Sequence, residues 1–186
     1  VTQEAAQPMR SGLDLEFDRR VRSVIEEYAH ATRCALAAGF DGVELHGASG
    51  FLPMQFLSSG TNLRTDHYGG SAANRARFTR EVLEAMIAVA GCRRVGIKLS
   101  PEFAHNDTHD ADPVGTYTHL TRVISGMGIA YLHVAQAASA SSDYHALLQP
   151  LFKGAYFAGG GLERDTAAAM IREGRADAAV FGVLFL

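Results

Sequence analysis

Five short apolar segments recur along this sequence, and a stretch with helical spacing of apolar residues separates each from the next. The segments are DGVELH, RRVGIKLSP, IAYLHVA, AYFAG and ADAAVFG. Near-continuous apolar strands that alternate with amphipathic helices are typical of a parallel sheet covered by helices. The alternation therefore predicts an α/β fold with about five parallel strands.

The intervening stretches predict the helices. Apolar residues three or four apart indicate helices over residues 17–38 and 72–90, and a third that opens at Asp112–Pro113 and ends near Gly126 or Gly128. Residues 144–151 form a short segment of uncertain type, and GGLERDTAAAMIREG reads as a glycine-rich turn into a helix. No linker or low-complexity stretch divides the chain, so we expect one domain over residues 1–186.

Two architectures fit this order, a doubly wound open sheet and a (β/α)8 TIM-type barrel. A polar residue or glycine stands at or just after the end of each predicted strand, and these are His46, Lys98, His133, the 159–161 glycine run and Gly182. In a barrel all five places converge on one face, whereas an open sheet uses mainly the loops at one switch point. The pattern favours the barrel. It is incomplete, because such a barrel has eight strands and about 250 residues.

Composition narrows the partners. The formal net charge of −3 and a pI near 6.2 argue against nucleic acid. No apolar run approaches the roughly 18 residues of a membrane span, and the first residues lack the order of a signal peptide. Two cysteines are too few for a disulfide framework. We therefore expect the protein to work in a reducing cytoplasm. No cysteine or histidine spacing indicates zinc. The patch HNDTHD could be a weak metal site, but a solvated loop is the favoured interpretation.

Several residues invite a chemical reading and also have a structural one. The turn FAGGGLERDT has the layout of a phosphate site, and a plain turn is about as good an interpretation. Lys98 would either pair with Glu44 on the neighbouring strand or meet an anionic ligand. His46 and His133, taken alone, are more often structural. The stretch NLRTDHYGGSAANRARF is interpreted mainly as a self-paired loop that caps a helix, with Ser71 as the N-cap.

One long stretch carries a specific resemblance. The run AGFDGVELHGASGFLPMQFLSSGTNLRTDHYGGSAANRARF closely resembles the Old Yellow Enzyme family, the NADH:flavin oxidoreductases. The later pieces RVGIKLSP, IAYLHVA, FKGAYFAGGG and ADAAVFGVLFL fall in the family's order and spacing. The resemblance implies a (β/α)8 barrel that carries FMN. By the same resemblance, this chain corresponds to the fourth through eighth strands, preceded by the third helix.

The resemblance also implies a reaction and its residues. In the family, NAD(P)H reduces the flavin, which passes hydride to the β-carbon of an activated alkene. His46 stands where the family's first carbonyl-binding residue stands, and Ser49 takes the place of the second with a shorter arm. Phe51 stands in the place of the proton-donating tyrosine and has no hydroxyl.

For the cofactor, the resemblance implies a phosphate site with altered charge. Gly160, Gly161 and Gly182 match the phosphate-binding backbone of the family. Lys98 replaces an arginine near the flavin, which keeps the charge and loses the planar fork. Val183 stands where the family has a phosphate-binding arginine. We therefore expect FMN to bind weakly or not at all to this chain alone.

Three functions stay open at this point. The first is an FMN-dependent oxidoreductase of the ene-reductase type with an altered active site. The second is a non-redox isomerase or cyclase, and the third is a catalytically inactive partial barrel or subunit. Because an incomplete barrel exposes strand edges, we also expect a homo-oligomer or a chain that completes the barrel. A small-molecule substrate is the expected ligand.

Overall fold

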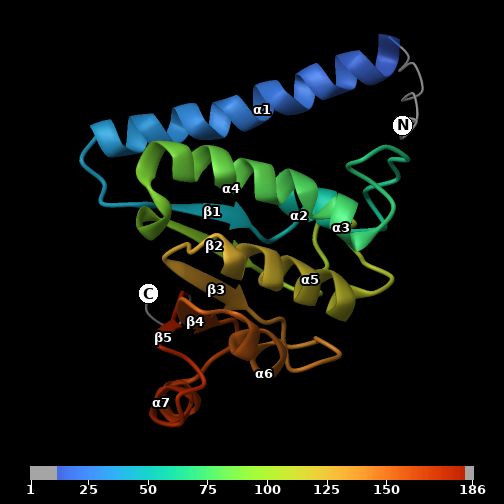
Figure 1. The fold of residues 1–186 in the computed structure, drawn as a ribbon. Coiled ribbons are helices and arrows are strands. Elements are labelled where there is room, and N and C mark those ends of the chain that lie inside the picture. The colour runs from blue at the N-terminus through green and yellow to red at the C-terminus, as the bar shows by residue number, and fades with distance from the viewer. Residues whose placement is uncertain (1–11, 183–186) are drawn as a thin grey trace, which may run out of the picture.

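The computed structural model describes residues 12–182, and its elements alternate between helix and strand (Figure 1). The strands are β1 (Val43–Gly47), β2 (Val95–Leu99), β3 (Tyr131–Ala135), β4 (Ala155–Gly159) and β5 (Ala178–Val180). The α-helices are α1 (Gly12–Ala37), α2 (Leu52–Leu57), α3 (Ala72–Arg75), α4 (Arg77–Ala90), α5 (Pro113–Gly126), α6 (Tyr144–Leu148) and α7 (Arg164–Arg172). Two 3₁₀ turns, Cys92–Arg94 and Gln149–Leu151, precede β2 and β4.

The five strands form one sheet in the order β1-β2-β3-β4-β5, and every neighbouring pair is parallel. Figure 1 shows the same succession, from the blue α1 at the top to the red α7 at the bottom. The α/β fold and the parallel sheet in chain order are confirmed. Because parallel strands end at a common edge, the residues that follow them meet on one side of the molecule.

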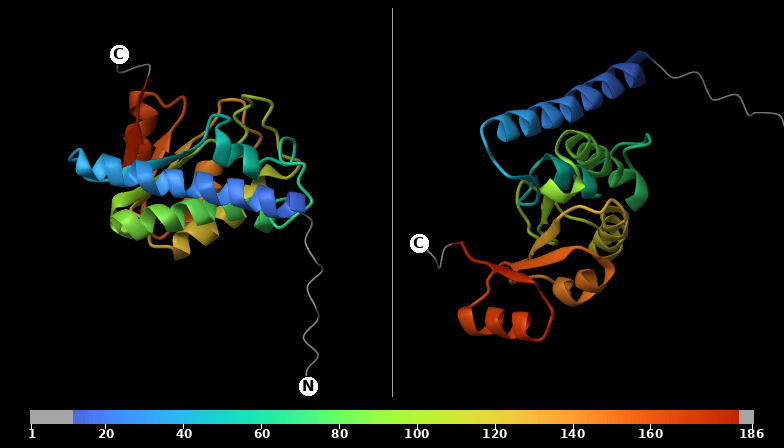
Figure 2. Two further views of the ribbon diagram at one scale, coloured as in Figure 1. Left: turned by 90° about the horizontal axis from the view of Figure 1, so that it is seen from above. Right: turned by 60° about the vertical axis from the view of Figure 1, so that its left-hand side comes forward.

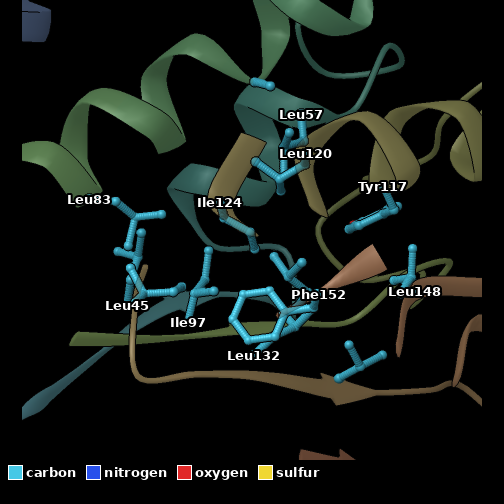
Figure 3. Packing of buried hydrophobic residues seen from close by; sticks show 14 of the residues in the cluster. Leu45, Leu57, Leu83, Ile97, Tyr117, Leu120, Ile124, Leu132, Leu148 and Phe152 are labelled. Carbon is cyan, nitrogen blue, oxygen red and sulfur yellow. The ribbon is translucent and has the colours of Figure 1, made fainter. Parts of the chain in front are cut away.

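Alternation along each strand separates a core face from a polar face. Leu45, Ile97 and Leu132 lie on the side of the sheet that the helices cover, and each is at most 2% exposed. They pack with Leu83 from α4 and with residues of α5, as Figure 3 shows. Since successive side chains point to opposite faces, the intervening residues point away from the helices. The polar side chains of β1, β2 and β3 therefore project from the other face.

The helix boundaries follow local signals, with two departures from prediction. The first helix ends at Ala37, where Gly39 takes a φ of 93°, and α5 begins at Pro113 behind the N-cap Asp112. The helix predicted over residues 72–90 is divided in two at Ala76. The short α2 was not predicted, because six residues are too few to show a helical period.

The outermost layer is α1, which packs chiefly on α4 (Figures 1 and 2). Within residues 12–182, no helix combines the length and the apolar character that crossing a membrane requires. The packing of α1 leaves the polar face of the sheet uncovered by this helix.

The stretch between α2 and α4 is a self-paired structural loop, as predicted. Ser71 caps α3 by accepting a hydrogen bond from the amide of Asn74. The buried guanidinium of Arg75 donates to the carbonyl of Leu57 at 2.6 Å and pairs with the carboxylate of Asp110 at 3.2 Å. Arg75 thereby ties this loop to the HNDTHD segment. That segment serves here as a partner for the loop.

Candidate active site

Three polar side chains lie in register on adjacent strands. His46 on β1 pairs with Lys98 on β2, and Lys98 pairs with His133 on β3. All three point to the face opposite the helices, because successive side chains along a strand point to opposite faces of the sheet. His46 is exposed, Lys98 is half-buried and His133 is buried. The three residues give the polar face a row of groups that can donate hydrogen bonds.

The ring of His46 is biased toward its neutral form. Burial lowers the pKa of His46 below 6.5, the nearby Lys98 ammonium lowers it further, and Glu44 opposes part of the effect. A neutral imidazole donates one hydrogen bond and accepts one. His46 can therefore hold a carbonyl oxygen without carrying a charge. Its ring lies 4.8 Å, centroid to centroid, from that of Phe51.

The small residues after β1 are explained by close packing against the loop after β2. Ser49 has a φ of 54°, and its amide donates to the hydroxyl of Ser100 at 2.8 Å. Gly50 has a φ of 75°, and a Cβ there would lie 2.5 Å from the carbonyl oxygen of His105. The turn therefore has a fixed backbone. It places the 56%-exposed ring of Phe51 beside the ring of His46.

Lys98 does not form the ion pair with Glu44 that was one of its two readings. The carboxylate of Glu44 instead lies 3.3 Å from Nδ1 of His133. Within the part of the chain that the structure describes, Lys98 has no carboxylate within ion-pair distance. The Lys98 ammonium still interacts electrostatically with Glu44, because it helps to lower the pKa of that carboxyl group. The half-buried ammonium is thus available to an anionic or carbonyl-rich ligand.

The glycine-rich turn after β4 has the geometry of an anion cradle. Gly160 and Gly161 have φ angles of 87° and 66°, which residues other than glycine rarely adopt. A Cβ on Gly160 would lie 2.2 Å from the carbonyl oxygen of Gln136, so only glycine fits there. The turn leads into α7 behind Glu163, whose side chain does not cap the helix. The first amides of α7 therefore point toward the turn and favour a negative charge.

A cavity of about 560 Å³ joins the cation to this turn. Its walls include Lys98 and His133 from the strands, and Gly160, Gly161 and Gly182 from the loops. A phosphate ester fits such a place, because backbone amides and an ammonium can both reach it. Of the residues predicted to bind the cofactor, four of five thus line one cavity. The fifth, Val183, lies outside the described residues.

The catalytic candidates lie beside this cavity. His46 neighbours Lys98 across the β1–β2 pair, and Phe51 contacts His46. The sequence reasoning missed the pair of Glu44 with His133. The sequence indicates only the face, because Glu44 precedes His46 by two residues and so shares its face of β1. The role of Ser100, which fixes Ser49, has no comparable signal in the sequence.

The family follows from comparison with known proteins. The family model described as NADH:flavin oxidoreductase / NADH oxidase matches residues 7–186. The chain belongs to this family. The Old Yellow Enzyme resemblance is therefore confirmed. Among curated proteins, 12-oxophytodienoate reductase 1 of Oryza sativa subsp. japonica is 37% identical and matches 100% of this chain and 52% of its own length.

Other members of the NADH:flavin oxidoreductase family give the same result. A probable flavin mononucleotide-dependent alkene reductase of Leishmania infantum is 42% identical over 87% of this chain and 45% of its own length. Morphinone reductase in complex with tetrahydroNAD superposes with a TM-score of 0.83 at 37% identity, covering 88% of this chain and 45% of that chain. The old yellow enzyme homologue of Zymomonas mobilis superposes with a TM-score of 0.85 at 30% identity, covering 98% of this chain and 53% of that chain.

These matches define the fold of the chain more closely. The sheet of five parallel strands is a partial TIM-type barrel of the Old Yellow Enzyme kind. The chain spans about half the length of the curated relatives that it matches. Activity, substrate and partners are therefore matters for proposal.

Proposed function

We propose that the protein acts as an FMN-dependent oxidoreductase of the ene-reductase type, with NAD(P)H as the reductant. The observation that carries the proposal is the single cavity that joins Lys98 to Gly160, Gly161 and Gly182, next to His46. Membership of a flavin oxidoreductase family supports it. FMN, when bound, supplies the hydride that is transferred to an activated alkene.

The chain's own residues account for binding and orientation. Gly160, Gly161 and Gly182 would hold the phosphate on backbone amides, and Lys98 would lie against the more polar part of the flavin. His46, kept neutral by burial and by Lys98, would donate a hydrogen bond to the carbonyl of the substrate. Ser49 would supply a second, shorter donor from its fixed turn. Polarisation of the carbonyl makes the β-carbon a better hydride acceptor.

The active site is altered at the proton-donating step. Phe51 has no hydroxyl, so the proton for the α-carbon must come from solvent or another acid. Because the Phe51 ring is 56% exposed, water can approach this side of the site. Loss of a positioned general acid typically costs about 10²–10⁴-fold in rate. We expect a slow enzyme.

A second candidate is a non-redox isomerase or cyclase, and the observation that favours it is again Phe51. A site that clamps a carbonyl but offers no proton at this position suits reactions without net reduction. A third possibility, a catalytically inactive partial barrel, remains an outcome of the test.

The test uses the purified chain with excess FMN under anaerobic conditions. NADH or NADPH is added, followed by a cyclic enone, and the flavin absorbance and the products are recorded. An ene-reductase bleaches with NAD(P)H and recovers its colour with the enone. An isomerase converts its substrate without consuming NAD(P)H. An inactive chain does neither.

We further propose that residues 1–186 form one partial-barrel domain that works in the cytoplasm on a small molecule. The partner that completes the site would be a second copy of the chain or a chain that supplies the remaining strands. FMN would bind weakly to this chain alone, because Val183 brings no charge to the phosphate.

A further inference from the structure

The strand β3 crosses the middle of the cofactor cavity. It lies between β2, which carries Lys98, and β4, which leads into the glycine-rich turn. His133 is the residue of β3 in register with Lys98, and it lines the same cavity. Any ligand that touches both Lys98 and Gly160 must therefore pass β3 at this point.

The orientation of the His133 ring is set from two strands away. Nδ1 of His133 lies 3.3 Å from Oε2 of Glu44, whose carboxylate also accepts a hydrogen bond from the Tyr131 hydroxyl. Burial works against ionisation of Glu44, but hydrogen bonds from His133 and Tyr131 and the nearby Lys98 ammonium help to lower the pKa of Glu44. An ionised carboxylate can only accept hydrogen bonds, so Nδ1 of His133 donates to it. Nε2, the other ring nitrogen, takes no part in this contact.

A glycine makes room for Tyr131, the second partner of Glu44. Gly96 of β2 stands in register between Glu44 and Tyr131. A Cβ on Gly96 would lie 2.3 Å from the ring of Tyr131. The missing side chain therefore lets the ring of Tyr131 lie across β2.

The other ring edge of His133 faces the phosphate end of the cavity. A Cβ on Gly159 would lie 2.9 Å from Nε2 of His133, so this nitrogen lies against the backbone that opens the glycine-rich turn. The residue is 5% exposed. Nε2 is thus held between Lys98 and Gly160, which line the same cavity.

We propose that His133 is a further binding residue of this site, and that its Nε2 forms a hydrogen bond with a hydroxyl of the ribityl chain of FMN. Glu44 is the positioning residue that holds the proton on Nδ1. The inference rests on the proposed function, since it assumes a phosphate on Gly160 and a flavin beside Lys98. The sugar alcohol between them then passes over β3. Its hydroxyls can both donate and accept hydrogen bonds.

The first test needs no variant. The imidazole nitrogens of the wild-type chain are followed by NMR during titration with FMN and, separately, with riboflavin, each to millimolar concentration. Both ligands carry the ribityl chain. We expect the Nε2 resonance of His133 to shift with both flavins. A His133 signal that stays still while other resonances move would overturn the inference.

The second test measures dissociation constants for both flavins. His133→Phe keeps an aromatic ring and removes both ring nitrogens, and it should weaken the binding of FMN and of riboflavin alike by roughly tenfold, as expected for one buried hydrogen bond. Glu44→Gln keeps an acceptor for Nδ1 and should stay near wild type, whereas Glu44→Leu should match His133→Phe. The control is His119→Gln, on the outer helix α5. Thermal unfolding checks that each variant is folded.

The outcomes separate this inference from the proposed function. A loss for FMN with none for riboflavin would put His133 at the phosphate and overturn the ribityl contact. Flavin binding by His133→Phe that equals that of His119→Gln would overturn the inference alone. If the wild-type chain bound neither flavin at millimolar concentration, the proposed function would fail, and this inference with it.

Discussion

At the scale of single residues, we propose that Phe51 limits the rate of the proposed reaction, because it brings no hydroxyl to the site. Its ring lies 4.8 Å from that of His46, centroid to centroid, so Phe51→Tyr would add a hydroxyl to a ring that contacts His46. We expect Phe51→Tyr to increase the rate of enone reduction, by up to about 10²–10⁴-fold if proton transfer limits turnover. Steady-state kinetics with excess FMN measures this.

The matched control for that substitution is Phe103→Tyr. Phe103 is also an exposed phenylalanine, at 42%, but it lies on the loop after β2. This control should leave the rate unchanged. An equal rate for wild type and Phe51→Tyr would show that the proton does not come from this position.

Two histidines make the stability of the fold depend on pH. Burial lowers the pKa of His46 and of His145 below 6.5. As the pH falls through about 6.5, the unfolded chain therefore takes up protons that the native chain does not, and the free energy of unfolding decreases. Urea unfolding between about pH 7.5 and 5.5 should show this loss.

A variant assigns part of that loss. His145→Gln should flatten the decrease with falling pH, while His109→Gln, an exposed histidine on a loop, should not. Carboxylates affect stability only at lower pH. The pKa values of Glu44 and Glu102 lie below 4.5, so their contribution to the free energy of unfolding is lost only in stronger acid. A slope for His145→Gln equal to that of wild type would contradict the account.

At the scale of elements, Arg75 holds the loops above the sheet together. Its guanidinium bonds the carbonyl of Leu57, the hydroxyl of Thr116 and the carboxylate of Asp110. Both members of the ion pair are buried, with side-chain exposures of 8% and 7%. We expect Arg75→Met to reduce the free energy of unfolding by about 3–5 kcal/mol, since it leaves Asp110 unpaired.

The comparison is with an arginine on the surface. Arg80 pairs with Glu84 one turn along α4, and both are exposed. Arg80→Met should cost less than about 1 kcal/mol. Denaturant unfolding of the two variants decides between them, and equal costs would mean that the buried network does not hold the loops.

The elements that were predictable are those with a local signal. Apolar runs gave the five strands, and Ser71, Asp112 and Gly39 mark helix ends that the structure confirms. The break at Ala76 has no such signal, because alanine is a good helix former.

The site was predictable to the same extent. Strand ends indicated His46, Lys98 and the glycine-rich turn, since position along a strand can be read from sequence. The partner of Glu44 could not be read in this way. Whether it meets Lys98 or His133 depends on how side chains from three strands pack on one face, a property of the assembled sheet.

At the scale of the whole molecule, the open sheet should drive association. Among the described residues, β1 and β5 each pair with another strand on one side only. Unpaired strand edges promote pairing with other chains. We expect dimers or larger species at micromolar concentration, and light scattering measures them.

A charge on the edge strand tests the cause. Val180 on β5 is 37% exposed, and Val180→Lys should shift the population toward monomers. Leu63→Lys, at a 79%-exposed site in the loop before α3, is the control and should not. A wild-type chain that is monomeric throughout would contradict association through the open sheet.

We propose that the cavity between Lys98 and the glycine-rich turn holds a flavin that can be reduced. An anaerobic titration of the chain with FMN, followed by NADH or NADPH and then a cyclic enone, tests this by absorbance. We expect saturable FMN binding, bleaching by NAD(P)H and return of the oxidised spectrum with the enone. A chain that leaves the FMN spectrum unchanged at every step, even at millimolar FMN, would contradict it.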